Sequence, residues 1–208
     1  MLEVDGLCKS YGGRTVLESV RFFLPEGQCL GLVGENGSGK STLLRLLAQI
    51  EKPDSGDVRY KGRSIMGDRR FFRTRVGYVP QYNDLLQELT VDAQLKLWQS
   101  ACGLKQPLSP ELETLLGIEP MRQKQIRNLS GGMQRRVSIA MALMGDPEIL
   151  IMDEATTGLD RDYRLALMEW LEGFLARGGR MIWCSHDPEE LERLCGDQIR
   201  ICQGHLER

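Results

Sequence analysis

The segment that most constrains the fold of this chain is Gly-Glu-Asn-Gly-Ser-Gly-Lys-Ser-Thr, at residues 34–42. An apolar run from Cys29 to Val33 precedes it, and a run with leucines at helical spacing, from Leu43 to Leu47, follows it. The order of strand, glycine-rich turn and helix is the context that the phosphate-binding pattern G-x-x-x-x-G-K-[ST] requires. A chance glycine turn before an ordinary helix is the alternative, and the flanking strand and helix disfavour it.

The residue types of segment 34–42 suit the binding of a phosphate chain. Glycines allow the backbone to curl so that successive N–H groups point inward, and the helix start adds the positive end of its dipole. In this pattern Lys40 reaches the β- and γ-phosphates, and the Ser41 hydroxyl binds Mg²⁺. The candidate phosphate-binding residues are Gly34, Asn36, Gly37, Ser38, Gly39, Lys40, Ser41 and Thr42.

Length and composition favour one soluble domain. The 208 residues are 41% hydrophobic and 27% charged, and the net charge of -2 gives no general attraction to nucleic acid, so no nucleic-acid partner is expected. No apolar stretch approaches the roughly 20 residues that span a bilayer, and the N-terminus lacks the layout of an export signal. The six cysteines include no C-x-x-C pair and are expected to be reduced, which favours the cytoplasm.

Strands and helices alternate along most of the chain. Short segments broken by turns over residues 1–28 predict an antiparallel β subdomain. Strands are expected at 29–33, 57–60, 76–79, 148–152, 180–184 and 198–202, the last of them closing the chain. Helices are expected from the phosphate loop to about residue 50 and over 90–101, 110–117, 133–143 and 189–194. One more helix is expected to end at the two glycines 178–179. This alternation predicts an α/β fold with a mostly parallel sheet and helices on both faces.

Residues 82–129 differ in character from the segments around them. Caps at Thr90 and Ser109 start two helices, and a connector rich in Lys, Arg and Gln follows. We therefore expect a small helical insertion in a single domain. Its expected parts are a nucleotide-binding core, 1–81 and 130–208, and a helical subdomain, 82–129.

Two features have only an ordinary interpretation from local pattern. Tyr11 stands before the Gly12-Gly13 turn. From local pattern alone it is interpreted as a packing residue on a loop. Five arginines within residues 63–75 are interpreted as a solvated face.

Polar side chains follow two of the expected strands. Asp153 and Glu154 come directly after strand 148–152, and ligands of parallel sheets collect beyond the carboxyl ends of strands. Asp153 is a candidate Mg²⁺ ligand, and Glu154 a candidate to polarise water at a γ-phosphate. His186 follows strand 180–184 and is a candidate γ-phosphate partner, although lone histidines are more often structural. A surface Asp-Glu pair is the alternative, and the phosphate loop disfavours it.

With these motifs in this order, the chain resembles, over its whole length, the ATPase subunit of an ATP-binding cassette (ABC) transporter. The most specific sign is Leu129-Ser130-Gly131-Gly132, which resembles the signature motif of that family. It stands at an expected helix N-terminus, where N–H groups and Ser130 can bind a second set of phosphate oxygens. An ordinary capped helix start would explain these four residues alone, but not the order of the motifs. The resemblance implies a P-loop NTPase fold.

The resemblance also implies roles for residues outside the phosphate loop. Tyr11 resembles the aromatic residue that stacks on adenine, which replaces the packing interpretation. Gln81 resembles the glutamine that binds Mg²⁺ and senses the nucleotide, and Asp160 lies in a segment that resembles the loop crossing the dimer interface. The implied catalytic residues are Glu154, His186 and Gln81, the implied metal ligands are Ser41, Gln81 and Asp153, and the implied contacts of a second subunit with ATP are Ser130, Gly131, Gly132 and Asp160.

Two positions depart from the family pattern. Met133 stands where glutamine is most common, and Ala155 where proline is common. Neither position supplies a phosphate, metal or water ligand, so hydrolysis is still expected.

The resemblance implies an ATP-hydrolysing subunit that uses ATP and Mg²⁺ and powers transport through separate transmembrane permease subunits. It implies a homodimer, held peripherally at the cytoplasmic face of the cell membrane, with permease helices docked beside Gln81 and the helical insertion. Met133 and the lack of a C-terminal extension favour an export-type system. The alternatives are a soluble ABC-class ATPase with a non-transport partner and a nucleotide-binding regulator without catalysis. The resemblance implies that the permease subunits, and not this chain, select the transported substrate.

Overall fold

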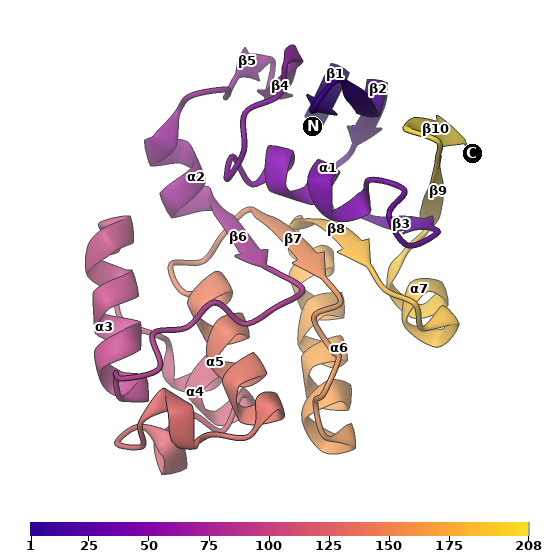
Figure 1. Cartoon of the computed structure of the whole chain (residues 1–208). Helices are drawn as coiled ribbons and strands as arrows, with labels where there is room; N and C mark the ends of the chain where they lie inside the picture. The colour runs from indigo at the N-terminus through magenta and orange to yellow at the C-terminus, as the bar shows by residue number, and fades with distance from the viewer. Residues whose placement is uncertain (208) are drawn as a thin grey trace.

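The computed structural model describes residues 1–207, whose strands form two sheets (Figure 1). The first sheet is antiparallel and has the order β2-β1-β4-β5. Its strands are β1 (Leu2–Tyr11), β2 (Arg14–Leu24), β4 (Ser55–Tyr60) and β5 (Arg63–Ser64). The expectation of antiparallel strands near the N-terminus is therefore confirmed, although Tyr11 ends a strand and does not lie in a loop.

The second sheet is parallel except for one edge strand, and has the order β10-β9-β3-β8-β7-β6. Its strands are β3 (Cys29–Gly34), β6 (Val76–Val79), β7 (Ile149–Asp153), β8 (Arg180–Cys184), β9 (Asp197–Cys202) and β10 (His205–Glu207). The expectation that strand 198–202 closes the chain is wrong. Gln203 and Gly204 both have positive φ, which is the two-residue turn of a hairpin, and β10 follows.

Seven α-helices and two short 3₁₀ helices occur within residues 1–207. They are α1 (Lys40–Leu47), α2 (Arg69–Arg75), α3 (Val91–Cys102), α4 (Pro110–Leu115), α5 (Gly131–Leu143), α6 (Arg161–Ala176), α7 (Pro188–Leu194), η1 (Glu119–Met121) and η2 (Ile126–Asn128). The side chains of Thr90 and Ser109 cap α3 and α4, as expected. α1 ends three residues before the expected Ile50, because Gln49 turns into the left-handed region with φ 52°.

Helix α2 is an element that the sequence analysis did not predict. Asp68 caps it by accepting a hydrogen bond from the Phe71 N–H at 2.9 Å, and Phe72 is its one buried residue. Its arginines are exposed, as the interpretation of a solvated face requires, but they lie on a helix.

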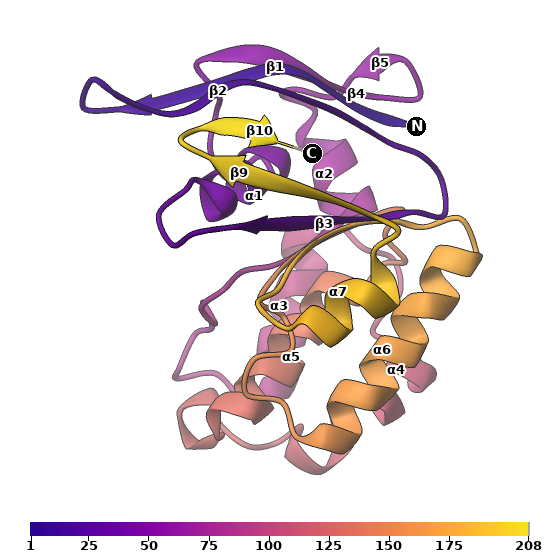
Figure 2. The same cartoon turned by 90° about the vertical axis from the view of Figure 1, so that its right-hand side faces the viewer.

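The parallel sheet is buried on both faces, and its side chains alternate between two clusters. On one face Leu32 and Ile151 pack with the leucines of α1 and the inner side of the antiparallel sheet. On the other face Leu150 and Trp183 pack with the helices α3 to α7. Figures 1 and 2 show α1 between the two sheets and α3 to α6 on the opposite side of the parallel sheet. The expected coverage of both faces is confirmed.

The helices between residues 82 and 129 pack as an extension of this second cluster. Leu95 of α3, Leu112 of α4 and Ile126 of η2 are buried with Val137 and Ile139 of α5. The segment thus shares one continuous core with the sheet.

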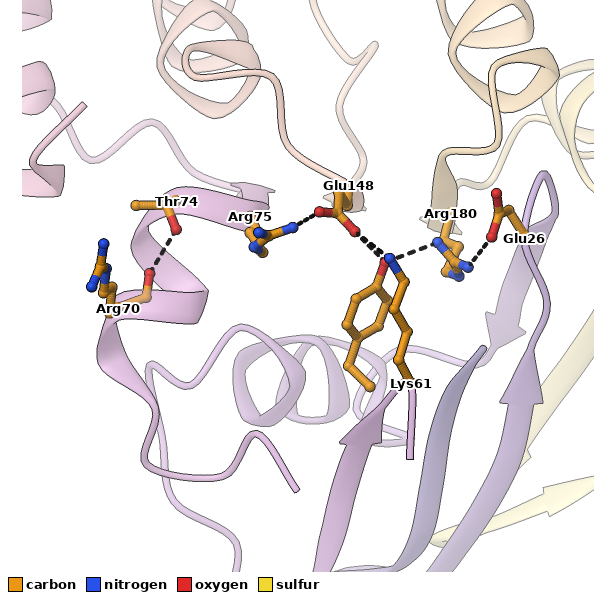
Figure 3. A network of polar contacts seen from close by, with 8 residues as sticks. Glu26, Lys61, Arg70, Thr74, Arg75, Glu148 and Arg180 are labelled. Atoms are coloured by element: carbon orange, nitrogen blue, oxygen red, sulfur yellow. Dashed lines mark hydrogen bonds and ion pairs between the residues drawn. The ribbon is translucent and has the colours of Figure 1, made fainter. Parts of the chain in front are cut away.

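A polar network joins the two sheets at the amino ends of β7 and β8 (Figure 3). Arg180 is only 2% exposed, pairs with Glu26 at 2.8 Å and donates to the Tyr60 hydroxyl at 3.2 Å. Tyr60 also contacts Glu148, which pairs with Arg75. The network lies at the opposite edge of the sheet from Asp153 and Cys184, the last residues of β7 and β8. Within residues 1–207 no helix has the length and apolar character needed to cross a membrane.

Candidate functional site

A cavity of about 490 Å³ lies at the carboxyl edge of the parallel sheet. It gathers residues from the β1–β2 hairpin, the phosphate loop and the ends of β6, β7 and β8. Its lining residues are Tyr11, Val16, Asn36, Gly37, Gly39, Lys40, Ser41, Thr42, Gln81, Tyr82, Asp153, Glu154, Cys184 and His186. Eleven of these fourteen are residues that the sequence analysis proposed for nucleotide binding or catalysis.

The phosphate loop needs glycine at both ends. Gly34 ends β3 with φ +150°, and a Cβ there would lie 2.6 Å from the Ile201 carbonyl oxygen. Gly39, which precedes α1, has φ +111°, and its Cβ would lie 3.0 Å from Leu17. A side chain at Gly34 would clash with the Ile201 backbone, and the positive φ at both positions strains any residue other than glycine.

Lys40, the first residue of α1, lies back over the loop. Its ammonium donates to the carbonyl oxygens of Gly34 at 2.7 Å and of Glu35 at 2.9 Å, and the residue is 9% exposed. An ammonium has three donors, so one remains for a phosphate oxygen. The loop therefore holds a partly buried positive charge at the entrance to α1.

Asp153, at the end of β7, carries a buried carboxylate oxygen without a partner. The residue is 2% exposed, and its Oδ2 makes no hydrogen bond. The same cavity contains Ser41 and Gln81, and oxygen ligands of these types suit Mg²⁺. No group of three or more His, Cys, Asp or Glu side chains placed to hold a metal occurs in the described part of the chain, 1–207. These residues fit a Mg²⁺ ion that takes its other ligands from phosphate and water.

Glu154 is held in an unusual backbone conformation beside His186. Its φ is +53°, and its N–H donates to the Cys184 carbonyl at 2.9 Å. Its Oε1 lies 3.5 Å from His186 Nε2 and has no hydrogen-bond partner. Burial raises the pKa of Glu154, His186 partly offsets the rise, and Asp153 adds to it. A positive φ on a residue other than glycine is strained and is common at functional sites.

The raised pKa of Glu154 predicts how the ATP hydrolysis expected from the sequence would depend on pH. A protonated carboxylic acid cannot accept a proton from water, so kcat is expected to fall as the pH is lowered through the pKa of Glu154. This fall should centre above the ordinary glutamate value of 4.5. Turnover measured at saturating ATP across this range checks the prediction, with folding followed by circular dichroism at each pH. A fall centred at or below the ordinary value would contradict it.

Arg135 is a residue of the site that the sequence analysis missed. It lies on α5, is 3% exposed, and donates to the carbonyl oxygens of Pro80 at 2.5 Å, Gln81 at 2.8 Å and Glu154 at 2.9 Å. One guanidinium thus fixes the backbone of the two segments that carry Gln81 and Glu154. The charged pair Arg135-Arg136 stands before the apolar part of a helix, but the sequence does not indicate the distant carbonyl oxygens that Arg135 binds.

The signature residues adjoin a second cavity, of about 530 Å³. Ser130 caps α5 by accepting from the Met133 N–H at 3.2 Å, and Gly131 and Gly132 line the cavity. A Cβ on Gly132 would lie 2.3 Å from the Gly158 carbonyl oxygen, so glycine permits this close approach. The residues that both cavities share are Gln81, Tyr82, Glu154 and His186. Segment 34–42 contributes to the first cavity and is absent from the described lining of the second.

Four proposed residues lie outside the described linings of these two cavities: Gly34, Ser38, Ser130 and Asp160. Gly34 allows the loop to approach the Ile201 backbone closely, and Ser38 Oγ is buried without a partner. Asp160 is the N-cap residue of α6, where its side chain makes no capping hydrogen bond.

Comparison with known proteins gives consistent matches. The sequence model described as "ABC transporter" matches residues 17–157, which is more than half of the chain. "Nod factor export ATP-binding protein I" of Paraburkholderia xenovorans is 41% identical over 205 residues, covering 97% of this chain and 66% of that protein. The protein of the same name from Ralstonia nicotianae is 39% identical over 208 residues, covering 98% of this chain and 65% of the relative. The chain therefore spans slightly less than two thirds of the length of these relatives.

Solved structures agree with the fold. The ATP-binding subunit of an ABC transporter superposes with a TM-score of 0.91 at 28% identity, covering all of this chain and 88% of that subunit. A dimeric ATP-binding cassette in a post-hydrolysis state, bound to ADP and Pi, superposes with a TM-score of 0.88 at 25% identity, covering all of this chain and 97% of the cassette. The P-loop NTPase fold expected from the sequence is confirmed.

Proposed function

The chain belongs to the ABC transporter family, and we propose that it is the ATP-hydrolysing subunit of such a transporter. One observation carries this proposal. A single cavity contains the phosphate loop, an unpartnered Asp153 oxygen, and the pair of Glu154 and His186. Phosphate binding, metal binding and activation of water are thus available within reach of one ligand.

ATP is proposed to bind with its adenine against Tyr11 and its phosphates in loop 34–42. Tyr11 is 43% exposed and lines the cavity, so its ring is accessible to a base. The backbone N–H groups of the loop, the helix dipole of α1 and the Lys40 ammonium all favour the negative charge of the phosphates.

Ser41, Gln81 and Asp153 are the residues proposed to hold Mg²⁺. Mg²⁺ bound there would neutralise charge on the β- and γ-phosphates and help to align them. The unpartnered Oδ2 of Asp153 supports this assignment, because a buried carboxylate oxygen without a partner is costly unless a cation or donor satisfies it.

Hydrolysis is proposed to use Glu154 as the general base. Its free Oε1 accepts a proton from the attacking water, and the raised pKa of Glu154 makes it a stronger base than an ordinary carboxylate. His186, at 3.5 Å from Glu154, contacts the γ-phosphate and keeps the carboxylate in place. Arg135 fixes the backbone of Glu154 and Gln81 relative to each other.

Two copies are proposed to enclose each ATP. The signature glycines line a cavity next to Glu154, while loop 34–42 lines the other cavity, so the two phosphate-binding segments of one chain face different spaces. In a two-fold dimer each site pairs the phosphate loop of one copy with Ser130, Gly131, Gly132 and Asp160 of the other. The dimeric state of a solved relative supports this arrangement. We further propose that residues 82–129 act as a helical subdomain beside a core of 1–81 and 130–208.

A groove of about 710 Å³ is the proposed docking site for a permease subunit. It lies between the segment after α1, helix α2 and the helices α3 and α5. Apolar side chains at its surface include Ile50, which is 59% exposed, and Trp98, which is 36% exposed. The export function in the names of the relatives supports an export-type transporter, with this chain on the inner face of the cell membrane.

Placing a charge in this groove should weaken the permease complex. Ile50→Glu is expected to reduce by about tenfold or more the amount of membrane-spanning partner that copurifies in mild detergent, because a buried unpaired charge is costly. Leu165→Glu is the matched control, since Leu165 is 45% exposed on α6 and lies outside the groove. Equal loss, or no loss, in both variants would contradict the assignment of the groove.

The experiment that tests the proposed function is release of phosphate from ATP by the purified protein. We expect release that requires Mg²⁺ and stops when a chelator removes it. Nucleotide binding without release, in the presence of the membrane partner, would favour a regulator without catalysis.

A further inference from the structure

The adenine-facing end of the site contains a contact that the proposed chemistry does not use. The Tyr11 hydroxyl donates to the carboxylate of Glu51, and Arg45 Nε donates to the same carboxylate at 2.6 Å. We propose that Glu51 is a positioning residue, which holds the Tyr11 ring in the orientation that stacks on a purine base. This inference rests on the proposed binding of ATP in the cavity.

Glu51 links two parts of the site that are distant in sequence. Tyr11 ends β1 at the tip of a hairpin, 40 residues before Glu51. Arg45 belongs to α1, the helix that begins at Lys40 in the phosphate loop. Because one carboxylate binds both side chains, the ring that faces the base is tied to the helix that faces the phosphates. Burial by itself raises the pKa of Glu51, but hydrogen bonds from Tyr11 and Arg45 lower it below the ordinary glutamate value, so Glu51 is charged at neutral pH.

The turn that contains Glu51 also forms hydrogen bonds with β1, the strand that ends at Tyr11. Asp54 accepts from the Ser10 N–H at 2.7 Å, and its own N–H donates to the Cys8 carbonyl at 2.9 Å. The Lys9 ammonium donates to the Lys52 carbonyl at 2.7 Å. These three contacts fix the position of the strand, and the hydroxyl contact with Glu51 fixes the orientation of the Tyr11 ring.

The Tyr11 ring needs a contact that orients it, because it lies in an exposed part of the hairpin. Tyr11 is 43% exposed, and Gly12 and Gly13 follow it, both with positive φ. The Lys9 ammonium lies 5.2 Å from the ring centroid and covers the ring on that side. An exposed side chain that must be ordered on binding lowers affinity, and ordering it beforehand removes that cost. Glu51 orders the ring before the base arrives.

The test compares binding of MgATP with binding of Mg-tripolyphosphate, which has no base. Glu51→Ala and Tyr11→Phe are each expected to weaken MgATP binding about threefold to tenfold, since the ring is retained but part of the stacking is lost. Binding of tripolyphosphate should change less than about twofold, because loop 34–42 is untouched. The double variant should bind MgATP no more weakly than either single variant, since both changes remove the same contact.

Two further variants serve as controls. Glu51→Gln keeps an oxygen that accepts from the Tyr11 hydroxyl and is expected to restore most of the affinity. Glu172→Ala removes a carboxylate from an exposed ion pair with Arg193 and should leave both ligands unaffected.

The outcomes separate this inference from the proposed function. If the unaltered chain binds neither ligand, the proposed function fails. If it binds both, the inference is overturned by any of three results: unchanged MgATP affinity in Tyr11→Phe, equal weakening of MgATP and tripolyphosphate in Glu51→Ala, or additive effects in the double variant.

Discussion

Glu154→Gln is expected to bind ATP with nearly unchanged affinity and to hydrolyse it at least about 10²-fold more slowly. Glutamine keeps the length and the hydrogen-bonding reach of glutamate, but it cannot accept a proton from water. The contacts that bind the phosphates come from loop 34–42 and do not involve this side chain. Phosphate release at saturating ATP, together with a binding titration, measures both parts of the prediction.

A surface change of the same kind provides the control for this experiment. Glu172→Gln makes the same substitution in an exposed side chain paired with Arg193, and should leave turnover unchanged. Near-normal turnover in Glu154→Gln would show that another group accepts the proton. The first candidate would then be His186, which lies 3.5 Å from Glu154.

Lys40→Ala is expected to weaken ATP binding at least about tenfold without unfolding the protein. The ammonium makes a charge-assisted contact with phosphate that is worth about 1.5–3 kcal/mol, and about 1.4 kcal/mol corresponds to tenfold. Its loss also frees the carbonyl oxygens of Gly34 and Glu35, which it now satisfies. Titration with MgATP tests this expectation, with Lys96→Ala as the control because Lys96 forms an exposed pair with Asp92. Unchanged affinity would show that the phosphates bind elsewhere.

The parts of the fold that the sequence predicted well are those with strong local signals. The strands at 76–79 and 180–184 have the expected bounds, because short apolar runs between turn residues in a buried parallel sheet leave little choice of register. The phosphate loop was predictable because Gly34, Gly37 and Gly39 all have positive φ, which favours glycine, and a Cβ on Gly34 would also clash with the Ile201 backbone. Side-chain caps at Thr90 and Ser109 set the starts of two helices.

The missed elements lack such signals. Helix α2 buries only Phe72, so it has no apolar periodicity, and its arginines resemble a solvated loop. Strand β10 is three residues long and depends on its pairing with β9. The role of Arg135 depends on carbonyl oxygens 54 and 55 residues earlier in the chain, at Gln81 and Pro80, and local pattern does not contain that information.

The features of the candidate site also divide into those that the sequence predicted and those that only the structure showed. The sequence supplied its residue types, and the resemblance to a family supplied roles for Tyr11 and Gln81 that local pattern did not. The contact between Tyr11 and Glu51 spans 40 residues and came only from the structure.

The central claim is that each ATP lies between the phosphate loop of one copy and the signature of another. The most direct test mixes Lys40→Ala with Ser130→Arg, each inactive alone. In a mixed dimer one site combines the intact phosphate loop of one variant with the intact signature of the other. With random pairing, activity is expected to recover to at most about a quarter of that of the unaltered protein, because half of the dimers are mixed and each has one intact site.

The matched control places both substitutions in one chain and mixes it in excess with the unaltered protein. Every site of such a mixed dimer has one broken half, so the double variant is expected to suppress the activity of the unaltered chain. Recovery in the first mixture and suppression in the second are the predicted result. If mixed dimers form, yet the first mixture stays inactive and the second keeps the full activity of its unaltered chains, each copy binds ATP with its own signature, and the claim of a shared site is wrong.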